Sequence, residues 1–511
     1  MRTKPNICVA FGYEGAWNMV GATRTNLLAV TAFAGLLAAG CAGTNGSPGS
    51  NGPGMPPGVG SLPGAGPLGL KTGVGSDTGS GSSSAYIQHV VIVLQENRSF
   101  DDFFATFPGA VGATYGCMKS GGPAARGRRP SGSQCPSGDT VVPLTEAGLD
   151  SNSLGHERFS FIKEYDNGRM DGFNEVERAL RKGEKVPAGT YPYRYVDPKY
   201  IAPYWQIAQD WVLADHMFST QGSSSFTAHQ DFIAGGTPIG NDNVIDFPSP
   251  SNWGCTAPPG TVTSLVTQSG NYLRDKGPYP CFSYSTIRDL LDAKGISWLY
   301  FTNPSRSYVW DAFDAINAVR NGPEWTSNII VPETDIFQYV SNAQLPGVTY
   351  VIPDAGTSDH PGPAHDNGPD WVASVVNAIG ESAYWPSTVI IVVWDEWGGE
   401  YDNVPPPQLD GQGLGPRIPM LIVSAYDKET TPSQPGYISH TQYEDGSVLK
   451  FIEQNWGLGS LGTSDVRANS IIDSFDFTQA PRPFIPISYS QHPMSYFAHH
   501  YIPSREPIDE Y

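Results

Sequence analysis

Residues 389–399 read VIIVVWDEWGG, and this stretch decides the fold. Its apolar residues run without interruption and end at the acidic pair Asp395 and Glu396. A continuous apolar run of this length is typical of a strand that is buried on both faces of a parallel sheet. The acidic pair therefore lies at the carboxyl end of a strand, which is the edge where α/β sheets place their chemistry.

Other parts of the chain show the same strand character. Helical patterns alternate with these runs: in PDWVASVVNAIG, from Pro369, the apolar residues fall on one helix face, and STIRDLLDAKG and GSVLKFIEQNWG are also helical. This alternation predicts an α/β sandwich in which helices flank a central, mostly parallel sheet. The further apolar runs are His89–Leu94, Trp298–Phe301, Val348–Ile352 and Met420–Val423.

The first 41 residues have the pattern of an export signal. Residues 25–40 (TNLLAVTAFAGLLAAG) form a short apolar stretch after Arg24, which is typical of a secretory signal. The sequence AAGC at 38–41 resembles a bacterial lipoprotein cleavage site, so Cys41 is a candidate for lipidation and for a membrane tether. An ordinary secretory cleavage nearby is the alternative, and translation can start at Met1 or Met19.

The segment 42–84 is dominated by Gly, Ser and Pro and is expected to be a flexible linker. Residues 85–511 are expected to form one catalytic domain. Across the 511 residues, 39% hydrophobic and 12% aromatic side chains are enough for a packed interior. The formal net charge of −20 argues against a nucleic-acid partner, which needs a basic surface. It does not exclude a phosphorylated substrate, because a bound cation reverses the local field.

Four cysteines lie beyond the predicted linker, at positions 117, 135, 255 and 281. An even number of cysteines in an exported protein indicates disulfide bonds, and four of them allow three connectivities. None shows the C-x-x-C spacing of a structural zinc site. We favour the local pairs Cys117–Cys135 and Cys255–Cys281, because each closes a loop that is rich in Gly and Pro.

Acidic residues follow two of the predicted strands. Glu96 and Asn97 come just after the His89–Leu94 run, as Asp395 and Glu396 follow the run at 389–394. Oxygen ligands that converge from separate elements are what a hard divalent cation needs. The alternative is a cap at the turn from strand to loop, or an ion pair with Arg98.

A serine cluster and two histidines are further candidates. In GSSSFTAHQ, at 222–230, a serine before a helical stretch can place a hydroxyl at a helix N-terminus, which favours an ionised nucleophile. Plain helix capping is the alternative, and the G-x-S-x-G elbow of lipases is absent. His360, in the loop SDHPG, can donate a hydrogen bond to a phosphoryl oxygen, whereas His156 and His440 are weak signals singly.

Taken in order, these segments resemble one family. ENRSFDDFF, SFTAH, SDHPG and VVWDEWGGEYDNVPPP are similar to segments of the bacterial phosphoesterase family that contains acid phosphatases and phospholipases C. WGCTAPPG at 253–260 and HTQYEDGSVLKFIEQNWGL at 440–458 are also similar, and the resemblance extends from about Ile87 to Phe484. It implies an alkaline-phosphatase-like core with a metal site.

The resemblance also assigns roles to residues. Glu96 and Asn97 match the first ligand pair of the family, and Asp395 and Glu396 match the second. Ser225 matches the nucleophile, which also contacts the metal, although Ser223 or Ser224 takes this role if the register differs.

His156 and His360 match histidines that the family places around the phosphoryl group, and we expect their pKa values to lie near the working pH. The sequence departs from the family pattern at two points. Asn403 replaces the histidine of a YDHV segment, and no further histidine lies between His229 and His360.

The sequence therefore predicts an exported phosphoesterase that uses a divalent cation of unknown identity and a seryl nucleophile. It is expected in the cell envelope or secreted, with a phosphomonoester or a phospholipid as substrate. The alternative is a non-catalytic surface lipoprotein that binds carbohydrate or another ligand.

Overall fold

The computed structural model describes residues 83–119, 135–180, 184–246, 253–304, 309–362, 366–431 and 433–504. The predicted signal, Cys41 and all but the last two residues of the predicted linker lie outside these ranges. Every described element belongs to one compact unit, Asp77–Tyr511. Within the described ranges, no helix combines the length and the apolar character that crossing a bilayer requires.

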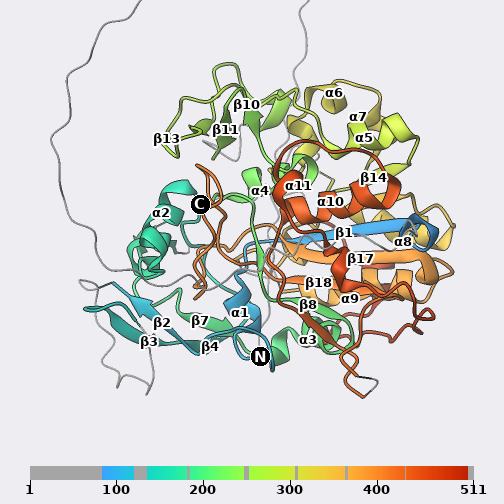
Figure 1. The fold of residues 1–511 in the computed structure, drawn as a ribbon, viewed down its shortest axis with the longest axis horizontal. Coiled ribbons are helices and arrows are strands. Elements are labelled where there is room, and N and C mark those ends of the chain that lie inside the picture. Colours follow the sequence, from blue (N-terminus) through green and yellow to red (C-terminus); the bar gives the residue numbers. More distant parts are fainter. Residues whose placement is uncertain are drawn as a thin grey trace, which may run out of the picture. The chain divides into compact units, whose positions relative to one another are not determined.

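An eight-stranded sheet forms the centre of this unit (Figure 1). Neighbouring strands run parallel except at β18, which is antiparallel to both of its neighbours. All five apolar runs are strands of this sheet, so the predicted α/β sandwich with a mostly parallel sheet is confirmed. In sheet order the strands are β15 (Ile329–Ile330), β14 (Trp298–Phe301), β16 (Val348–Val351), β1 (His89–Gln95), β17 (Thr388–Trp394), β18 (Met420–Ser424), β8 (Val212–Ala214) and β19 (Tyr437–Ser439).

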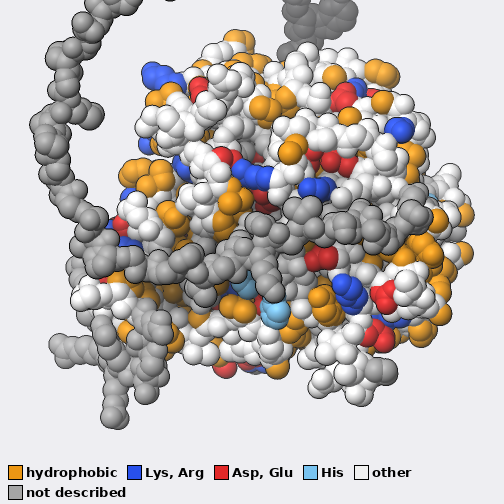
Figure 2. Space-filling model, in the orientation of Figure 1, with side chains coloured by type: hydrophobic (Ala, Val, Ile, Leu, Met, Phe, Trp, Pro, Cys, Tyr) orange, Lys and Arg blue, Asp and Glu red, His pale blue; other side chains and the backbone are white. Residues whose placement is uncertain are grey.

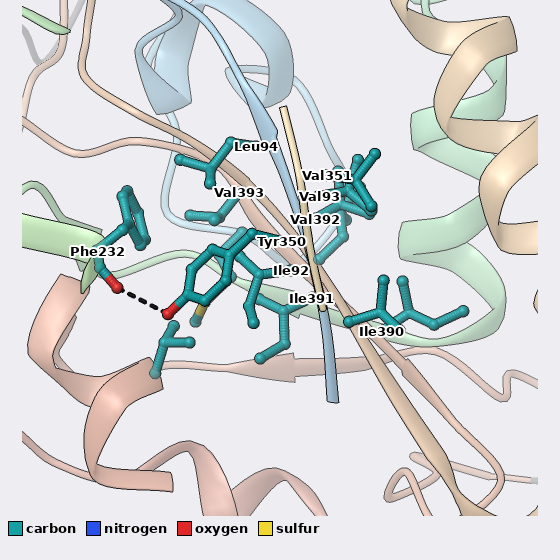
Figure 3. Close-up of a cluster of buried hydrophobic side chains, with 14 of the residues drawn as sticks. Ile92, Val93, Leu94, Phe232, Tyr350, Val351, Ile390, Ile391, Val392 and Val393 are labelled. Atoms are coloured by element: carbon teal, nitrogen blue, oxygen red, sulfur yellow. Dashed lines mark hydrogen bonds between the residues drawn. The ribbon is translucent and has the colours of Figure 1, made fainter. Parts of the chain in front are cut away.

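Side chains of the central strands are buried on both faces of the sheet, as their unbroken apolar sequences predict. In Figure 3, Val93 and Val392 point to one face, while Ile92 and Leu94 point to the other. The hydroxyl of Tyr350 donates a 3.0 Å hydrogen bond to the carbonyl of Phe232, which ties β16 to helix α4 (Figure 3). The buried hydroxyl of Tyr350 is therefore hydrogen-bonded, as most buried polar groups are.

Helices cover both faces, with α10 above the central strands and α9 below them in Figure 1. The helix predicted from Ser285 is α5, which begins with a capping box at Thr286 and ends at Gly295 in the left-handed conformation. The layer with α10 contains α4 (Ser225–Ala234), α10 (Asp445–Trp456) and α11 (Ser464–Arg467), and the layer with α9 contains α3 (Ala202–Asp210), α8 (Ile336–Ser341), α9 (Gly368–Gly380) and α12 (Met494–His499).

Smaller elements surround the sheet. Both predicted disulfides, Cys117–Cys135 and Cys255–Cys281, are formed. The remaining helices are α1 (Phe100–Phe104), α2 (Arg158–Tyr165), α5 (Ile287–Lys294), α6 (Asn317–Arg320) and α7 (Glu324–Ser327). The remaining strands pair as β2 (Tyr115–Met118) with β3 (Thr140–Pro143), β4 (Thr145–Ala147) with β7 (Arg194–Val196), β5 (Glu177–Ala179) with β6 (Lys185–Pro187), β9 (Met217–Phe218) with β20 (Tyr443–Glu444), and as a sheet of β10 (Pro238–Ile239), β11 (Asp242–Ile245), β12 (Ser264–Val266) and β13 (Tyr272–Leu273).

Charged side chains are mixed on the surface. On the face drawn in Figure 2, Lys and Arg side chains are scattered among Asp and Glu rather than gathered into one area. A basic stripe is what a protein needs to follow a nucleic-acid backbone. The charges on this face agree with the argument from net charge.

Candidate active site

Strands β1 and β17 bring the two predicted acidic corners together. Their register pairs Gln95 with Trp394, so the two strands end level. The amide of Asp395 donates to the carbonyl of Gln95 at 2.9 Å, and the amide of Asn97 donates to Asp395 Oδ1 at 2.8 Å. Glu96 and Asp395, 299 positions apart in the sequence, therefore sit side by side at the carboxyl edge of the sheet.

Three of the buried side chains at this edge form a group that suits a metal ion. One ligand atom from each of Glu96, His229 and Asp395 lies within 4.8 Å of the other two. His229 Nε2 is 2.8 Å from Glu96 Oε1 and 3.9 Å from Asp395 Oδ2. Two carboxylates and an imidazole are a donor set that binds divalent transition metals.

The electrostatics of this group also fit a cation. Burial raises the pKa of Asp395, because the charged form loses its hydration, while the neighbouring side chains of Glu96 and Ser225 oppose that shift. Burial lowers the pKa of His229 to about 3, so its imidazole is neutral at neutral pH. Neutral imidazole and ionised carboxylate are the forms that ligate metals. A cation would neutralise the two adjacent buried carboxylates.

His229 is the residue that the sequence reasoning missed. Ser225 is the first residue of α4, and His229 follows it by four positions. Residues four apart lie on the same face of a helix, and every residue of α4 is buried. The spacing S-x-x-x-H was therefore a usable signal, because a serine placed beside the carboxylates brings the histidine one turn later to the same place.

The structure distinguishes the three serines before and within α4. Ser223 is engaged elsewhere, since its hydroxyl donates to Asp246 Oδ1 at 2.6 Å. Ser224 is the N-cap residue of α4, but its side chain makes no capping hydrogen bond. Ser225 is fully buried and close enough to Asp395 to influence the pKa of that carboxyl. Of the three, it is Ser225 that faces the carboxylates.

His156 contacts the side chain of Asn97. Its Nδ1 is 2.6 Å from the carbonyl of Leu154, and because a carbonyl only accepts, Nδ1 carries the proton of the neutral ring. The Nε2 atom then accepts from Asn97 Nδ2 at 3.3 Å. The expectation of a pKa near the working pH is wrong for His156, because burial lowers its pKa to about 4.

The Glu396 carboxylate is turned away from its neighbour Asp395. Its Oε2 accepts the amide of Gly398 at 2.7 Å, and its Oε1 is 3.8 Å from His156 Nε2. The four predicted ligands are thus together at one edge, with Asp395 beside Glu96 and His229, and Glu396 beside His156.

His360 belongs to the loop that follows β16. This loop is fastened to the first acidic corner, because the amide of Glu96 donates to the carbonyl of Ser358 at 2.8 Å. The buried ring of His360 contacts Trp310, with ring centroids 5.6 Å apart, and Trp310 stacks on His229 at 6.5 Å. His360 is therefore connected to the cluster through the Trp310 ring.

The basic residues near these loops bind other groups. Arg98 pairs with Asp102 at 3.0 Å and donates to the carbonyls of Asp359 and Leu149. The ion-pair partner that the structure shows for Arg98 is Asp102, in helix α1. Asn403, where the family has a histidine, accepts from Arg417 Nη2 at 2.9 Å and lies in a separate polar cluster.

A metal-assisted ester hydrolase uses acidic groups, a neutral imidazole and a hydroxyl. Here these groups lie together at the carboxyl edge of an α/β sheet. The profile of the Phosphoesterase family matches residues 87–459. The chain belongs to this family, and it is a phosphoric ester hydrolase. The predicted resemblance is confirmed, and the non-catalytic alternative is not supported.

Curated relatives carry phospholipase names. Phospholipase C B of Mycobacterium tuberculosis is 24% identical, with 78% of this chain and 80% of that protein covered. Non-hemolytic phospholipase C of Pseudomonas aeruginosa is 23% identical over 78% of this chain, but the match spans only 59% of that longer protein. Non-specific phospholipase C3 of Arabidopsis thaliana is 21% identical, with 81% of this chain and 77% of that protein covered.

Among solved structures, a protein in the alkaline phosphatase superfamily from Vibrio parahaemolyticus matches with a TM-score of 0.32 and 11% identity. The match covers 54% of this chain and 68% of that one. A likeness of this degree carries no argument about activity.

The turn after β17 depends on glycine at position 398. Gly398 has φ +65°, and a Cβ there would lie 2.3 Å from the carbonyl oxygen of Asn97. We predict that Gly398→Ala displaces the Asn97 loop, so that phosphoesterase activity falls more than about tenfold and the free energy of unfolding drops by more than the 1–2 kcal/mol of left-handed strain alone. Kinetics and urea unfolding measure the two effects.

Gly295→Ala is the matched control. Gly295 has a similar φ of +68°, but no atom lies within 4 Å of the added Cβ. This variant should show the backbone strain alone and retain its activity. Equal behaviour of the two variants would mean that the contact with Asn97 does not hold the active-site turn.

Proposed function

We propose that this chain is an exported, metal-dependent phosphoesterase of the phospholipase C type, with Ser225 as nucleophile. The observation that carries the proposal is the buried group of Glu96, His229 and Asp395 beside the Ser225 hydroxyl. Membership of the Phosphoesterase family supplies the reaction class.

Glu96, Asp395 and His229 would hold the cation, with the Ser225 hydroxyl and the Asn97 side chain as neighbouring oxygen donors. When bound, the cation polarises the phosphoryl group and favours the ionised form of the serine hydroxyl. A donor set that includes imidazole favours a transition metal such as Zn²⁺ over Ca²⁺. The position of His156 supports the role of Asn97, because the imidazole holds the amide group of that side chain.

In the first step, Ser225 Oγ attacks phosphorus and forms a new P–O bond. The bond from phosphorus to the leaving alcohol oxygen breaks, and the alcohol takes up the proton that the serine hydroxyl releases. Ser225 stands at the start of a ten-residue helix, so the partial positive charge of the helix N-terminus favours negative charge there. In the second step, water attacks phosphorus, the P–Oγ bond breaks, and the serine hydroxyl is restored.

We propose that His156 and His360 contact the phosphoryl oxygens of the bound substrate. In the absence of substrate the His156 ring is neutral and its Nε2 is an acceptor. A negatively charged phosphoryl group near an imidazole raises the pKa of the ring, because an opposite charge favours the protonated form. Substrate binding would therefore convert Nε2 of His156 into a hydrogen-bond donor.

Two observations support the proposal that the protein is exported, namely the predicted signal and the disulfide bonds. Disulfides persist in oxidising compartments, and the cysteines at 117, 135, 255 and 281 are paired. We propose that the protein acts in the cell envelope or outside the cell, and that lipidation of Cys41 tethers it to a membrane.

Replacement of the nucleophile is the first test. We predict that Ser225→Ala lowers kcat for a chromogenic phosphate ester on the order of 10³-fold, because the covalent intermediate is lost. Ser224→Ala is the matched control and should remain close to wild type. Near-wild-type turnover by Ser225→Ala, or a collapse of turnover in Ser224→Ala alone, would discard Ser225.

Metal removal is the second test. We predict that dialysis against a chelator abolishes hydrolysis and that one divalent metal restores it. Glu96→Gln should weaken the affinity for that metal at least about tenfold, since a charged ligand is lost, while Glu381→Gln, at an exposed position, should not. Metal analysis and titration of activity with the metal provide the readouts. Full activity in a metal-free preparation contradicts the ligand set.

The substrate class is the third test. The relatives named as phospholipases C lead us to predict that kcat/KM for phosphatidylcholine exceeds that for a small phosphomonoester by at least about tenfold. Release of phosphocholine from mixed micelles and release of nitrophenol measure the two reactions. The opposite ranking would assign the chain to the phosphomonoesterases.

A further inference from the structure

A second group of potential ligands lies at the same edge of the sheet, on other strands. Strands β8 and β19 run parallel with Ala214 level with Ser439, so the next residues, Asp215 and His440, leave the sheet together. The amide of Asp215 donates to the carbonyl of Ser439 at 3.1 Å. Since Met420 pairs with both Ala214 and Val393, this edge is also the one at which β17 ends.

Asp215 is held between two imidazoles. His216 Nδ1 is 2.7 Å from Asp215 Oδ1, and His440 Nδ1 is 2.8 Å from Asp215 Oδ2. One ligand atom from each of the three residues lies within 4.8 Å of the other two. The carboxylate is fully buried, whereas the side chains of His216 and His440 are 26% and 58% exposed. The group is thus anchored inside the protein and open to solvent on one side.

The neighbouring structure holds the carboxylate in a fixed orientation. The amide of Val111 donates to Asp215 Oδ2 at 2.9 Å, and Arg417 Nη1 donates to the carbonyl of Asp215 at 2.8 Å. Burial raises the pKa of Asp215, but the hydrogen bonds from His216 and Val111 outweigh this effect, and the net shift is downward. Outer partners of this kind orient the ligands of metal sites.

A groove of about 590 Å³ adjoins His440. Phe107, Tyr437 and Ile438 contribute to its lining. A ligand that approaches through this groove reaches the His440 side chain. None of the groove residues belongs to the Glu96 cluster, so the group is distinct from the proposed active site.

We propose that Asp215, His216 and His440 form a second metal site, which binds Zn²⁺ or a similar transition-metal ion. Two imidazoles and one carboxylate leave a fourth coordination position open, as in zinc sites that bind a water molecule or an external ligand. On binding, each imidazole coordinates through Nδ1 and carries its ring proton on Nε2. The Asp215 carboxylate then binds the cation, in place of its hydrogen bonds with His216 and His440.

Zinc content tests this site without any use of catalysis. The full chain, without a histidine tag, is dialysed against Zn²⁺ and its metal content is measured. We expect His216→Ala and His440→Ala each to bind about one ion fewer than the wild type. His499→Ala removes an exposed histidine far along the chain and should keep the wild-type zinc content.

Cobalt substitution separates this site from the active site. The Co²⁺ form of Asp395→Asn should retain an absorption band that His440→Ala lacks, because the two variants affect different clusters. Thermal unfolding in the absence of metal verifies that the variants are folded. The inference is overturned if wild type, His216→Ala and His440→Ala hold equal zinc, if His499→Ala loses as much, or if Asp395→Asn also loses the band.

Discussion

The level pairing of β1 with β17 is the constraint on which the rest of the structure depends. Gln95 and Trp394 are partners in the ladder, and the next residue of each strand carries a carboxylate into the same buried space. A slip of one residue would turn one of these side chains to the opposite face of the sheet. The amide of Asn97 on Asp395 Oδ1 extends the pairing beyond the strands. The proposed metal site is therefore a consequence of strand register.

Buried charged side chains near the carboxyl edge of the sheet have two different kinds of surroundings. Arg417, fully buried, pairs with Asp402 at 2.9 Å and donates to the carbonyl of Asp215, so its charge is compensated within the protein. Glu96 and Asp395, in contrast, face a neutral imidazole and a hydroxyl. Two buried carboxylates and an imidazole within 4.8 Å of one another are the donor set at which we place the cation.

The two proposed metal sites share an edge but differ in character. The Glu96 group is enclosed, as a phosphoryl-transfer site that excludes water needs to be. The Asp215 group has one buried anchor and two imidazoles that reach the surface beside a groove. Arg417 contacts the carbonyl of Asp215 as well as Asn403, which lies on the segment that follows the active-site turn. Both sites therefore rest on loops that one arginine holds in place.

The sequence by itself determined the strands of the core, the acidic residues at their ends and the family, because unbroken apolar runs and local spacing are properties of neighbouring residues. It favoured the disulfide pairs that the structure contains, among three possible connectivities. Only the tertiary structure decided that His229 joins Glu96, that His216 meets His440, and that burial keeps His156 neutral. Each of these depends on elements far apart in the chain being packed together. Distance in space and loss of hydration are set by that packing. The S-x-x-x-H spacing indicated only that His229 lies near Ser225.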